Sequence, residues 1–262
     1  MHSYQKRRFE LKYRIPETML EPIRRFVSCH IDLDEYSAAH RDLAYPVHSL
    51  YLDSPDMKLF QSTINGDRNR YKLRVRYYER NGASPLFFEI KARRDRVIYK
   101  QRAMVRRESL SALLTGRPPT ADDLHERDEA QFLALDKFCA LRRSLDAAPK
   151  THVGYHREAW LAADNSVRVT MDQRVRIGPD FEAHLETELA GLATVFGKLA
   201  VLEIKFTDRY PRWLWELVQR FGLCQGSAAK YVDGVIALGE HWFLTGSGRA
   251  EIRRRMTLNA QP

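Results

Sequence analysis

Charged and apolar positions alternate along several short segments of this chain. In residues 8–14 the charged side chains take every second position, and Phe9, Leu11 and Tyr13 lie between them. Alternation with a period of two is typical of a β-strand with one apolar face. The same criterion predicts further strands at 48–53, 71–79, 86–93, 97–106, 151–161, 167–177 and 199–206.

Other segments carry apolar residues at helical spacing. In residues 129–145 apolar side chains recur every three or four positions, which predicts an amphipathic helix. Gly116 and Gly222 follow two further stretches of this kind and are typical of helix ends. The complete set of predicted helices is 16–28, 54–65, 109–115, 129–145 and 211–221.

The order of these elements predicts the fold class. Strands outnumber helices, and short turns such as Arg94-Asp95 and Asp164-Asn165 join consecutive strands, which favours antiparallel pairing. We therefore predict an α+β protein built on an antiparallel β-barrel with a polar interior and helices packed outside. No linker rich in proline, glycine or serine divides the chain, so we predict a single domain over residues 1–245 and a basic tail over 246–262.

Composition narrows the class of partner. The formal net charge of +9 and the isoelectric point near 9.5 indicate an anionic partner. Charge alone does not distinguish among phosphate, nucleic acid and acidic lipid. The three cysteines are far apart and fit no metal or redox spacing, as expected in a reducing compartment. We find no signal peptide and no apolar run long enough to span a bilayer, so we expect a cytoplasmic protein.

Two histidines call for a separate prediction. His152 and His156 are four positions apart, a spacing that would pair them on one face of a helix. They fall within a predicted strand instead. We therefore expect them at the surface rather than on a metal ion.

The same three-residue pattern occurs in three of the predicted strands. The segments are Glu10-Leu11-Lys12, Glu89-Ile90-Lys91 and Glu203-Ile204-Lys205. Side chains two positions apart point to the same side of a sheet, so each segment places a carboxylate beside an ammonium group. Three such segments suggest a charged face enclosed by the sheet, suited to a large anion and its metal ion.

The phase of each strand defines the remaining members of this face. Its basic members are Lys12, Arg74, Arg76, Lys91, Lys100, Arg102, Arg168 and Lys205, with Arg157 and Lys230 as candidates from flanking segments. Its acidic members are Glu10, Glu89, Asp172 and Glu203. Carboxylates suit Mg²⁺ or Mn²⁺, and arginine and lysine suit phosphate oxygens, which predicts phosphoryl-transfer chemistry. The alternative is that these side chains form the solvated side of a half-exposed sheet.

Several short motifs, in this order, resemble a known family. They are Phe9-Glu10-Leu11-Lys12-Tyr13, Ser49-Leu50-Tyr51-Leu52-Asp53, Lys72-Leu73-Arg74-Val75-Arg76-Tyr77, Phe88-Glu89-Ile90-Lys91, Tyr155-His156-Arg157-Glu158-Ala159, Val167-Arg168-Val169-Thr170-Met171-Asp172, Leu202-Glu203-Ile204-Lys205 and Ala229-Lys230-Tyr231. The chain resembles the VTC-type polyphosphate polymerase domain of the CYTH-like triphosphate tunnel metalloenzyme superfamily. The resemblance extends from Phe9 to about Gly234.

This resemblance implies a tunnel that binds a nucleoside triphosphate and a growing phosphate chain. It implies transfer of the γ-phosphate of ATP to polyphosphate, with Mn²⁺ or Mg²⁺ held by Glu203. The positions that match phosphate-binding residues of the family are Lys12, Arg74, Arg76, Lys91, Arg157, Arg168, Lys205 and Lys230. From the charged face we add Lys100 and Arg102 as substrate-binding residues, and Glu10, Glu89 and Asp172 as metal candidates.

Two rival functions remain open from the residues. A triphosphatase of the same fold would use water as the acceptor. A non-catalytic module would bind polyphosphate or RNA through its basic surface, but no aromatic stacking platform is evident, which disfavours nucleic acid as a partner. Whether a membrane protein receives the polymer is also left open.

Overall fold

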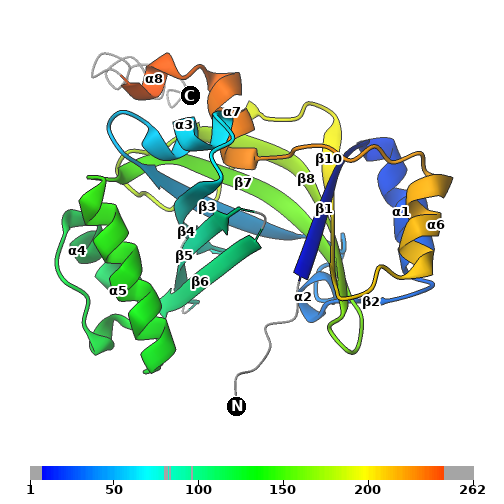
Figure 1. Cartoon of the computed structure of the whole chain (residues 1–262), viewed down its shortest axis with the longest axis horizontal. Helices are drawn as coiled ribbons and strands as arrows, with labels where there is room; N and C mark the ends of the chain where they lie inside the picture. The colour runs from blue at the N-terminus through cyan, green and yellow to red at the C-terminus, as the bar shows by residue number, and fades with distance from the viewer. Residues whose placement is uncertain (1–7, 80–81, 83, 96, 245–262) are drawn as a thin grey trace. The chain divides into compact units, whose positions relative to one another are not determined.

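The computed structural model describes residues 8–79, 82, 84–95 and 97–244 (Figure 1). The predicted basic tail at 246–262 lies outside the described residues. The strands are β1 (Arg8–Pro16), β2 (Asp32–Leu33), β3 (Tyr45–Asp53), β4 (Asn69–Tyr77), β5 (Leu86–Arg94), β6 (Val97–Val105), β7 (Ala148–Leu161), β8 (Val167–Pro179), β9 (Ala193–Thr194) and β10 (Leu199–Thr207). The longer strands fall where alternation predicts them.

Helices lie between these strands and after the last of them. They are α1 (Leu20–Val27), α2 (Glu35–Ala38), α3 (Lys58–Ile64), α4 (Leu110–Thr115), α5 (Glu129–Ser144), α6 (Arg212–Arg220), α7 (Lys230–Leu238) and α8 (His241–Leu244). Helix α5 begins where the Asp128 carboxylate accepts a hydrogen bond from the Gln131 backbone N–H, and α4 ends at Gly116, whose φ of +113° suits glycine. The sequence predictions omitted α2, α7 and α8.

The strands form an antiparallel sheet with the hydrogen-bonded order β1-β10-β8-β7-β3-β4-β5-β6. This confirms the α+β class and the antiparallel pairing. Among the described strands the order has two ends, β1 and β6. A fully closed barrel would require hydrogen bonds between those two ends. No backbone pairing joins them in the described residues, so the sheet is not closed by hydrogen bonds.

The chain divides into two compact units, and four of its described strands contribute residues to both. Unit 1 comprises Met1–Val47, Tyr155–Val175 and Thr194–Ala229, and unit 2 comprises the other segments, His48–Gly154, Arg176–Ala193 and Lys230–Pro262. Strands β3, β7, β8 and β9 each have residues in both units. The prediction of a single domain over 1–245 stays a prediction.

In unit 1 the apolar face of the sheet packs against helices. Ile204 and Val169, on β10 and β8, share one core cluster with Ile23 of α1 and Leu214 of α6. Figure 1 shows α1 and α6 side by side next to β1 and β10. Successive side chains of a strand point to opposite faces. The charged side chains of these strands therefore lie on the face away from α1 and α6.

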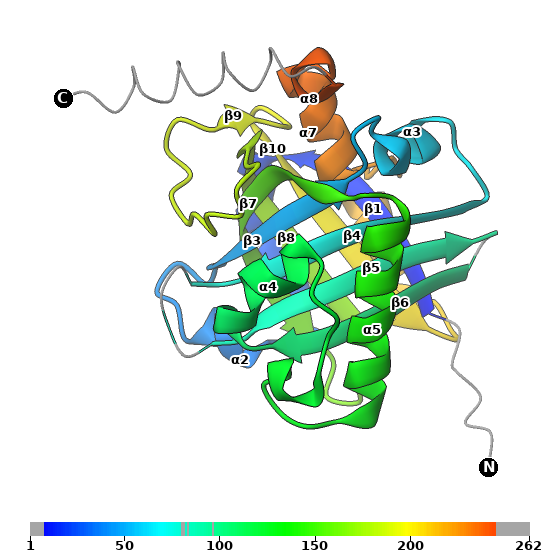
Figure 2. The ribbon, with the colours of Figure 1, turned by 90° about the vertical axis from the view of Figure 1, so that its left-hand side faces the viewer.

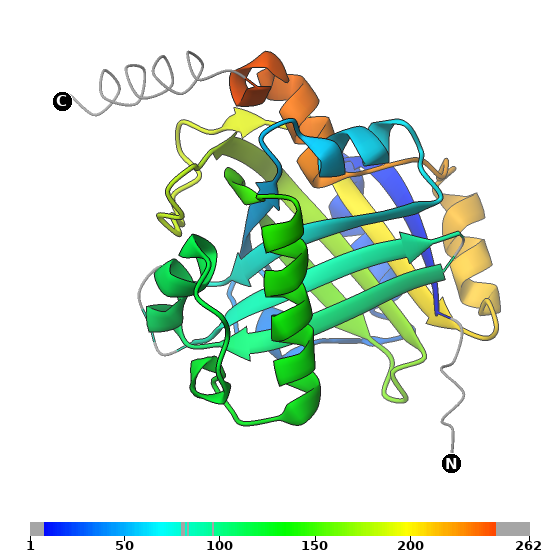
Figure 3. The same cartoon turned by 60° about the vertical axis from the view of Figure 1, so that its left-hand side comes forward.

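Unit 2 repeats this layering with different helices. Phe88 of β5 meets Phe138 of α5 edge to face, with 5.0 Å between ring centroids, and Leu113 of α4 joins the same cluster. Figures 2 and 3 both show α5 lying across β5 and β6. Helices thus cover the apolar side of both units, as predicted.

Within the described part of the chain, no helix is both long and apolar enough to cross a bilayer.

Candidate functional site

Strands β1, β10 and β8 bring the predicted site residues of unit 1 into register. Glu10 lies opposite Lys205, and Lys12 lies opposite Glu203. Lys205 in turn lies opposite Arg168 on β8. Directly opposed residues point to the same side of a sheet, so these five share one face, which we name face 1.

Lys12 lies between two carboxylates on face 1. Its Nζ is 3.1 Å from Glu10 Oε1 and 3.2 Å from Glu203 Oε1. Burial opposes the charged form, but the carboxylates of Glu203 and Glu10 raise the pKa of Lys12 above its ordinary value. Lys205 Nζ donates to Glu203 Oε2 at 2.6 Å, yet burial lowers the pKa of Lys205. Glu203, only 5% exposed, therefore connects both lysines.

A second ion pair on the same face joins β7 to β8. Arg157 Nε and Nη2 donate to the two carboxylate oxygens of Asp172 at 2.7 and 2.8 Å. Asp172 is 0% exposed. Burial opposes ionisation of Arg157, but the Asp172 carboxylate raises the pKa of Arg157 well above its usual range. This two-donor geometry fixes the guanidinium plane.

Arg168 has a partner that the sequence predictions missed. Its Nη2 donates to Asp34 Oδ2 at 2.7 Å, and Asp34 Oδ1 accepts a hydrogen bond from the Ser37 backbone N–H at the start of α2. Asp34 does not belong to a strand and shows no alternation that would have identified it. Arg168 is therefore held toward α2.

Strands β4, β5 and β6 form the corresponding charged face of unit 2, which we name face 2. Arg74 and Arg102 lie opposite Glu89 from its two sides. The next row along the strands consists of Lys72, Lys91 and Lys100. Face 2 therefore carries many more cations than carboxylates.

The carboxylate of Glu89 lies at the centre of face 2. Arg74 Nε donates to its Oε2 at 2.7 Å and Arg102 Nε to its Oε1 at 2.7 Å. Lys100 Nζ is 2.9 Å from Oε1, and Arg76 Nε is 3.9 Å from Oε2. Burial would raise the pKa of Glu89, but Arg74 and Arg76 hold it well below its usual range. Burial lowers the pKa of Lys100 to about 7, although Glu89 opposes this shift.

Tyr51 belongs to this face although the charge pattern omitted it. Its hydroxyl accepts a hydrogen bond from Arg74 Nη1 at 3.2 Å, and its ring stacks on Tyr231 at 4.8 Å. Tyr231 follows Lys230, the first residue of α7, and donates its hydroxyl proton to Asp53 Oδ2 at 2.8 Å. Tyr51 and Asp53 stand in one of the quoted motifs, which is the signal that could have identified them.

We expect Tyr51 to ionise at a lower pH than is usual for a tyrosine side chain. Burial would raise its pKa, but Arg74 and Lys72 lower it to about 8. A phenol is an acid, so its neutral form prevails below pH 8 and the phenolate above it. Phenolate absorbance followed from about pH 6 to about pH 10 should show one early ionisation, which Tyr51→Phe removes.

Tyr210 provides the matched control for this titration. Burial raises the pKa of Tyr210 to about 12, so Tyr210→Phe should leave the early ionisation in place. An absorbance change that begins only near pH 10 in the unaltered protein would contradict the assignment.

The metal candidates differ in how well they fit a divalent cation. The described residues contain no cluster of three or more histidine, cysteine, aspartate or glutamate side chains that could hold a metal ion. Glu10 and Glu203 face the same ammonium group, and Mg²⁺ is often bound by one or two carboxylates, with phosphate oxygens and water completing its shell. The pair fits that mode. Arginine forks already contact the oxygens of Glu89 and Asp172.

The surface prediction for His152 is wrong. His152 is buried, with its Nε2 3.0 Å from His48 Nδ1, and burial lowers the pKa of His152 to about 4. His156 is half-buried, and burial lowers its pKa as well. The strand crosses a region of unit 2 where both sides are covered, which alternation alone does not reveal.

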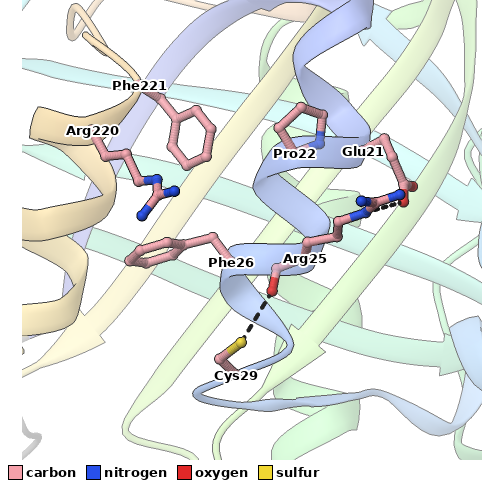
Figure 4. A pocket seen from close by; sticks show the side chains of 7 residues that line it. All are labelled: Glu21, Pro22, Arg25, Phe26, Cys29, Arg220 and Phe221. Atoms are coloured by element: carbon pink, nitrogen blue, oxygen red, sulfur yellow. Dashed lines mark hydrogen bonds and ion pairs between the residues drawn. The ribbon is translucent and has the colours of Figure 1, made fainter.

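A groove of about 550 Å³ lies on the helical side of unit 1 (Figure 4). Phe26 of α1 and Phe221, just after α6, form part of its lining, and Arg25 and Arg220 lie at its sides. The groove contains none of the predicted site residues. It lies on the helix-covered side, away from face 1.

Comparison with known proteins identifies the family. The VTC domain family matches residues 7–238, so the chain belongs to that family. Membership indicates an enzyme that binds triphosphates. No curated protein matches the chain.

Two solved structures show a distant likeness. A candidate adenylate cyclase from Bacillus halodurans aligns with a TM-score of 0.47 and 12% identity over 85% of this chain and 94% of that one. A chain of the Mediator head module from Schizosaccharomyces pombe aligns with a TM-score of 0.36 and 7% identity over 82% of this chain and 90% of that one. Neither likeness supports a functional conclusion.

Proposed function

We propose that this protein is a metal-dependent polyphosphate polymerase. In this reaction a terminal oxygen of polyphosphate attacks the γ-phosphorus of ATP, the bond from that phosphorus to the bridging oxygen breaks, and ADP leaves. The chain grows by one phosphate. The observation that carries the proposal is membership in the VTC domain family, combined with an excess of cations on face 2.

The residues of the two faces have distinct proposed roles. Phosphoryl transfer requires positioned cations that offset the charge of the phosphate oxygens. The proposed phosphate-binding residues are Lys12, Arg157, Arg168 and Lys205 on face 1, Arg74, Arg76, Lys91, Lys100 and Arg102 on face 2, and Lys230 at the start of α7. An Mn²⁺ or Mg²⁺ ion, when bound, would neutralise phosphate charge, and Glu203 with Glu10 would hold it. The proposed ligands are ATP and polyphosphate.

The proposed location is a reducing cytoplasm, where ATP is available. Cys29, Cys139 and Cys224 are free thiols, which agrees with such a compartment. A membrane protein that receives the polymer is a further candidate partner, and nucleic acid is not proposed.

Product analysis tests this function. We expect incubation with ATP, Mn²⁺ or Mg²⁺ and a short polyphosphate primer to yield lengthened chains, with one ADP released for each phosphate added. Gel electrophoresis measures the chain length, and an enzyme-coupled assay measures ADP. Release of orthophosphate without longer chains would instead identify a triphosphatase. Tight binding without turnover would identify a non-catalytic module.

A further inference from the structure

The carboxylate of Glu89 forms ion pairs with Arg74, Arg102 and Lys100 on face 2, and it is 0% exposed. Arg74 and Arg102 approach it from the neighbouring strands β4 and β6. The main chains of three strands thus hold one buried anion between two guanidinium groups.

The contacts of the two guanidinium groups are closely matched. Arg74 places Nε at 2.7 Å and Nη2 at 2.5 Å from Oε2. Arg102 places Nε at 2.7 Å and Nη2 at 2.6 Å from Oε1. Each arginine therefore directs a two-donor fork at one carboxylate oxygen, which fixes the plane of its guanidinium group. Lys100 also approaches Oε1, at 2.9 Å.

Such an arrangement is poorly suited to a metal ligand. A divalent cation would have to displace two guanidinium groups and approach a carboxylate already surrounded by positive charge. In contrast, the fork to Glu89 uses two of the five N–H groups that each guanidinium carries. Fixing those planes beforehand suits a site that must receive phosphate oxygens, because the cations need not reorganise during the reaction.

We propose that Glu89 is a positioning residue that orients Arg74 and Arg102 toward the transferred phosphate, and that it does not bind the metal ion. The proposal rests on the proposed function for its reaction, but its geometry is independent of whether the acceptor is polyphosphate or water. Glu89 itself does not touch the substrate. Its effect is transmitted through the two arginines.

Two substitutions test this role by kinetics. Glu89→Asp keeps the charge but shortens the side chain, and should shift both forks. Because a displacement of about 1 Å can cost about 100-fold in rate, we expect kcat to fall about 10- to 100-fold. KM for ATP should rise by a smaller factor than kcat falls, because the cations remain present but their forks no longer meet the phosphate oxygens as well. If the Glu89→Gln variant folds, it should show the same changes in kcat and KM. If it does not fold, the Glu89→Asp variant alone tests the positioning role.

Metal binding is measured separately from turnover. Titration of Mn²⁺ in the presence of tripolyphosphate, followed by electron paramagnetic resonance, should give the same Mn²⁺ affinity for Glu89→Asp as for the unaltered protein. Glu203→Gln should weaken that affinity. A loss of Mn²⁺ affinity in Glu89→Asp would overturn the proposal.

A double-mutant cycle tests the positioning role without any turnover. Calorimetry would give tripolyphosphate affinities for Glu89→Asp, Arg74→Lys and the double variant. Lysine has no fork to orient, so we expect the two changes to be non-additive by at least about threefold. A cycle of Glu89→Asp with Lys205→Arg, on face 1, should be additive.

These results separate the two proposals. Additive effects in the Arg74 cycle, or full kcat in Glu89→Asp, would overturn the role of Glu89. If the protein hydrolyses ATP or tripolyphosphate without making polymer, the proposed polymerase function fails while the Glu89 measurements keep their meaning. If it turns over no substrate, the cycle and the Mn²⁺ titration still decide the role of Glu89.

Discussion

Replacing Glu203 with glutamine should reduce turnover of ATP about 100- to 1,000-fold, the usual cost of removing one electrostatic contact to the transition state. The Glu203 carboxylate lies 3.2 Å from Lys12 Nζ and accepts from Lys205 Nζ at 2.6 Å. Glutamine keeps the shape of the side chain but removes its charge. The change would release two lysines and weaken the proposed metal site.

Steady-state rates at several Mn²⁺ concentrations measure this effect. The variant should need more Mn²⁺ and should not recover its full rate at saturation. Glu21→Gln is a matched control, because Glu21 lies on α1, on the side away from face 1, and forms ion pairs with Arg24 and Arg25. Full turnover by Glu203→Gln would show that the metal assignment is wrong.

Arg157→Met should lower the free energy of unfolding by about 3–5 kcal/mol, the range typical of a buried ion pair that loses one partner. Asp172 is 0% exposed, and both of its oxygens accept from Arg157. Methionine fills much of the volume but leaves a carboxylate buried without its cation. Urea denaturation, followed by far-ultraviolet circular dichroism, measures the change.

A double substitution separates the effect of charge from the effect of packing. Arg157→Met combined with Asp172→Asn should recover part of the lost stability, because no uncompensated charge remains buried. Arg25→Met removes an exposed arginine, 80% exposed, and should change stability by less than about 0.5 kcal/mol. A loss below about 1 kcal/mol for Arg157→Met would mean that water reaches Asp172 after the substitution.

The positions of the strands could be predicted because both of their faces leave a mark in the sequence. On β10, Leu202 and Ile204 pack in the core of unit 1. Glu203 and Lys205, which alternate with them, form an ion pair with each other. Glu203 also contacts Lys12, and Lys205 also interacts with Glu10. The alternation of apolar and charged residues with a period of two thus indicates which face of the strand packs against the helices. The site predictions followed from the same phase, which placed the charged residues of each unit on one side of its sheet.

Other features left little trace in the pattern. Helix α7 was not predicted, and its Tyr231 is buried against Tyr51, which a local pattern of short apolar segments does not reveal. His152 lies beside His48, more than a hundred residues earlier in the chain, at 3.0 Å. Contacts between residues so far apart in sequence depend on how the strands pair.

The sequence by itself determined the strand positions, the covered and charged faces, and the types of charged residue available for chemistry, because each is a local consequence of side-chain alternation. Only the tertiary structure decided which charges pair. Glu89 is enclosed by Arg74 and Arg102 because β5 lies between β4 and β6, and Asp34 reaches Arg168 from a loop. Strand register decides which charged side chains lie close to one another. Burial makes an unpaired charge costly, so each buried charge pairs with one of these neighbours.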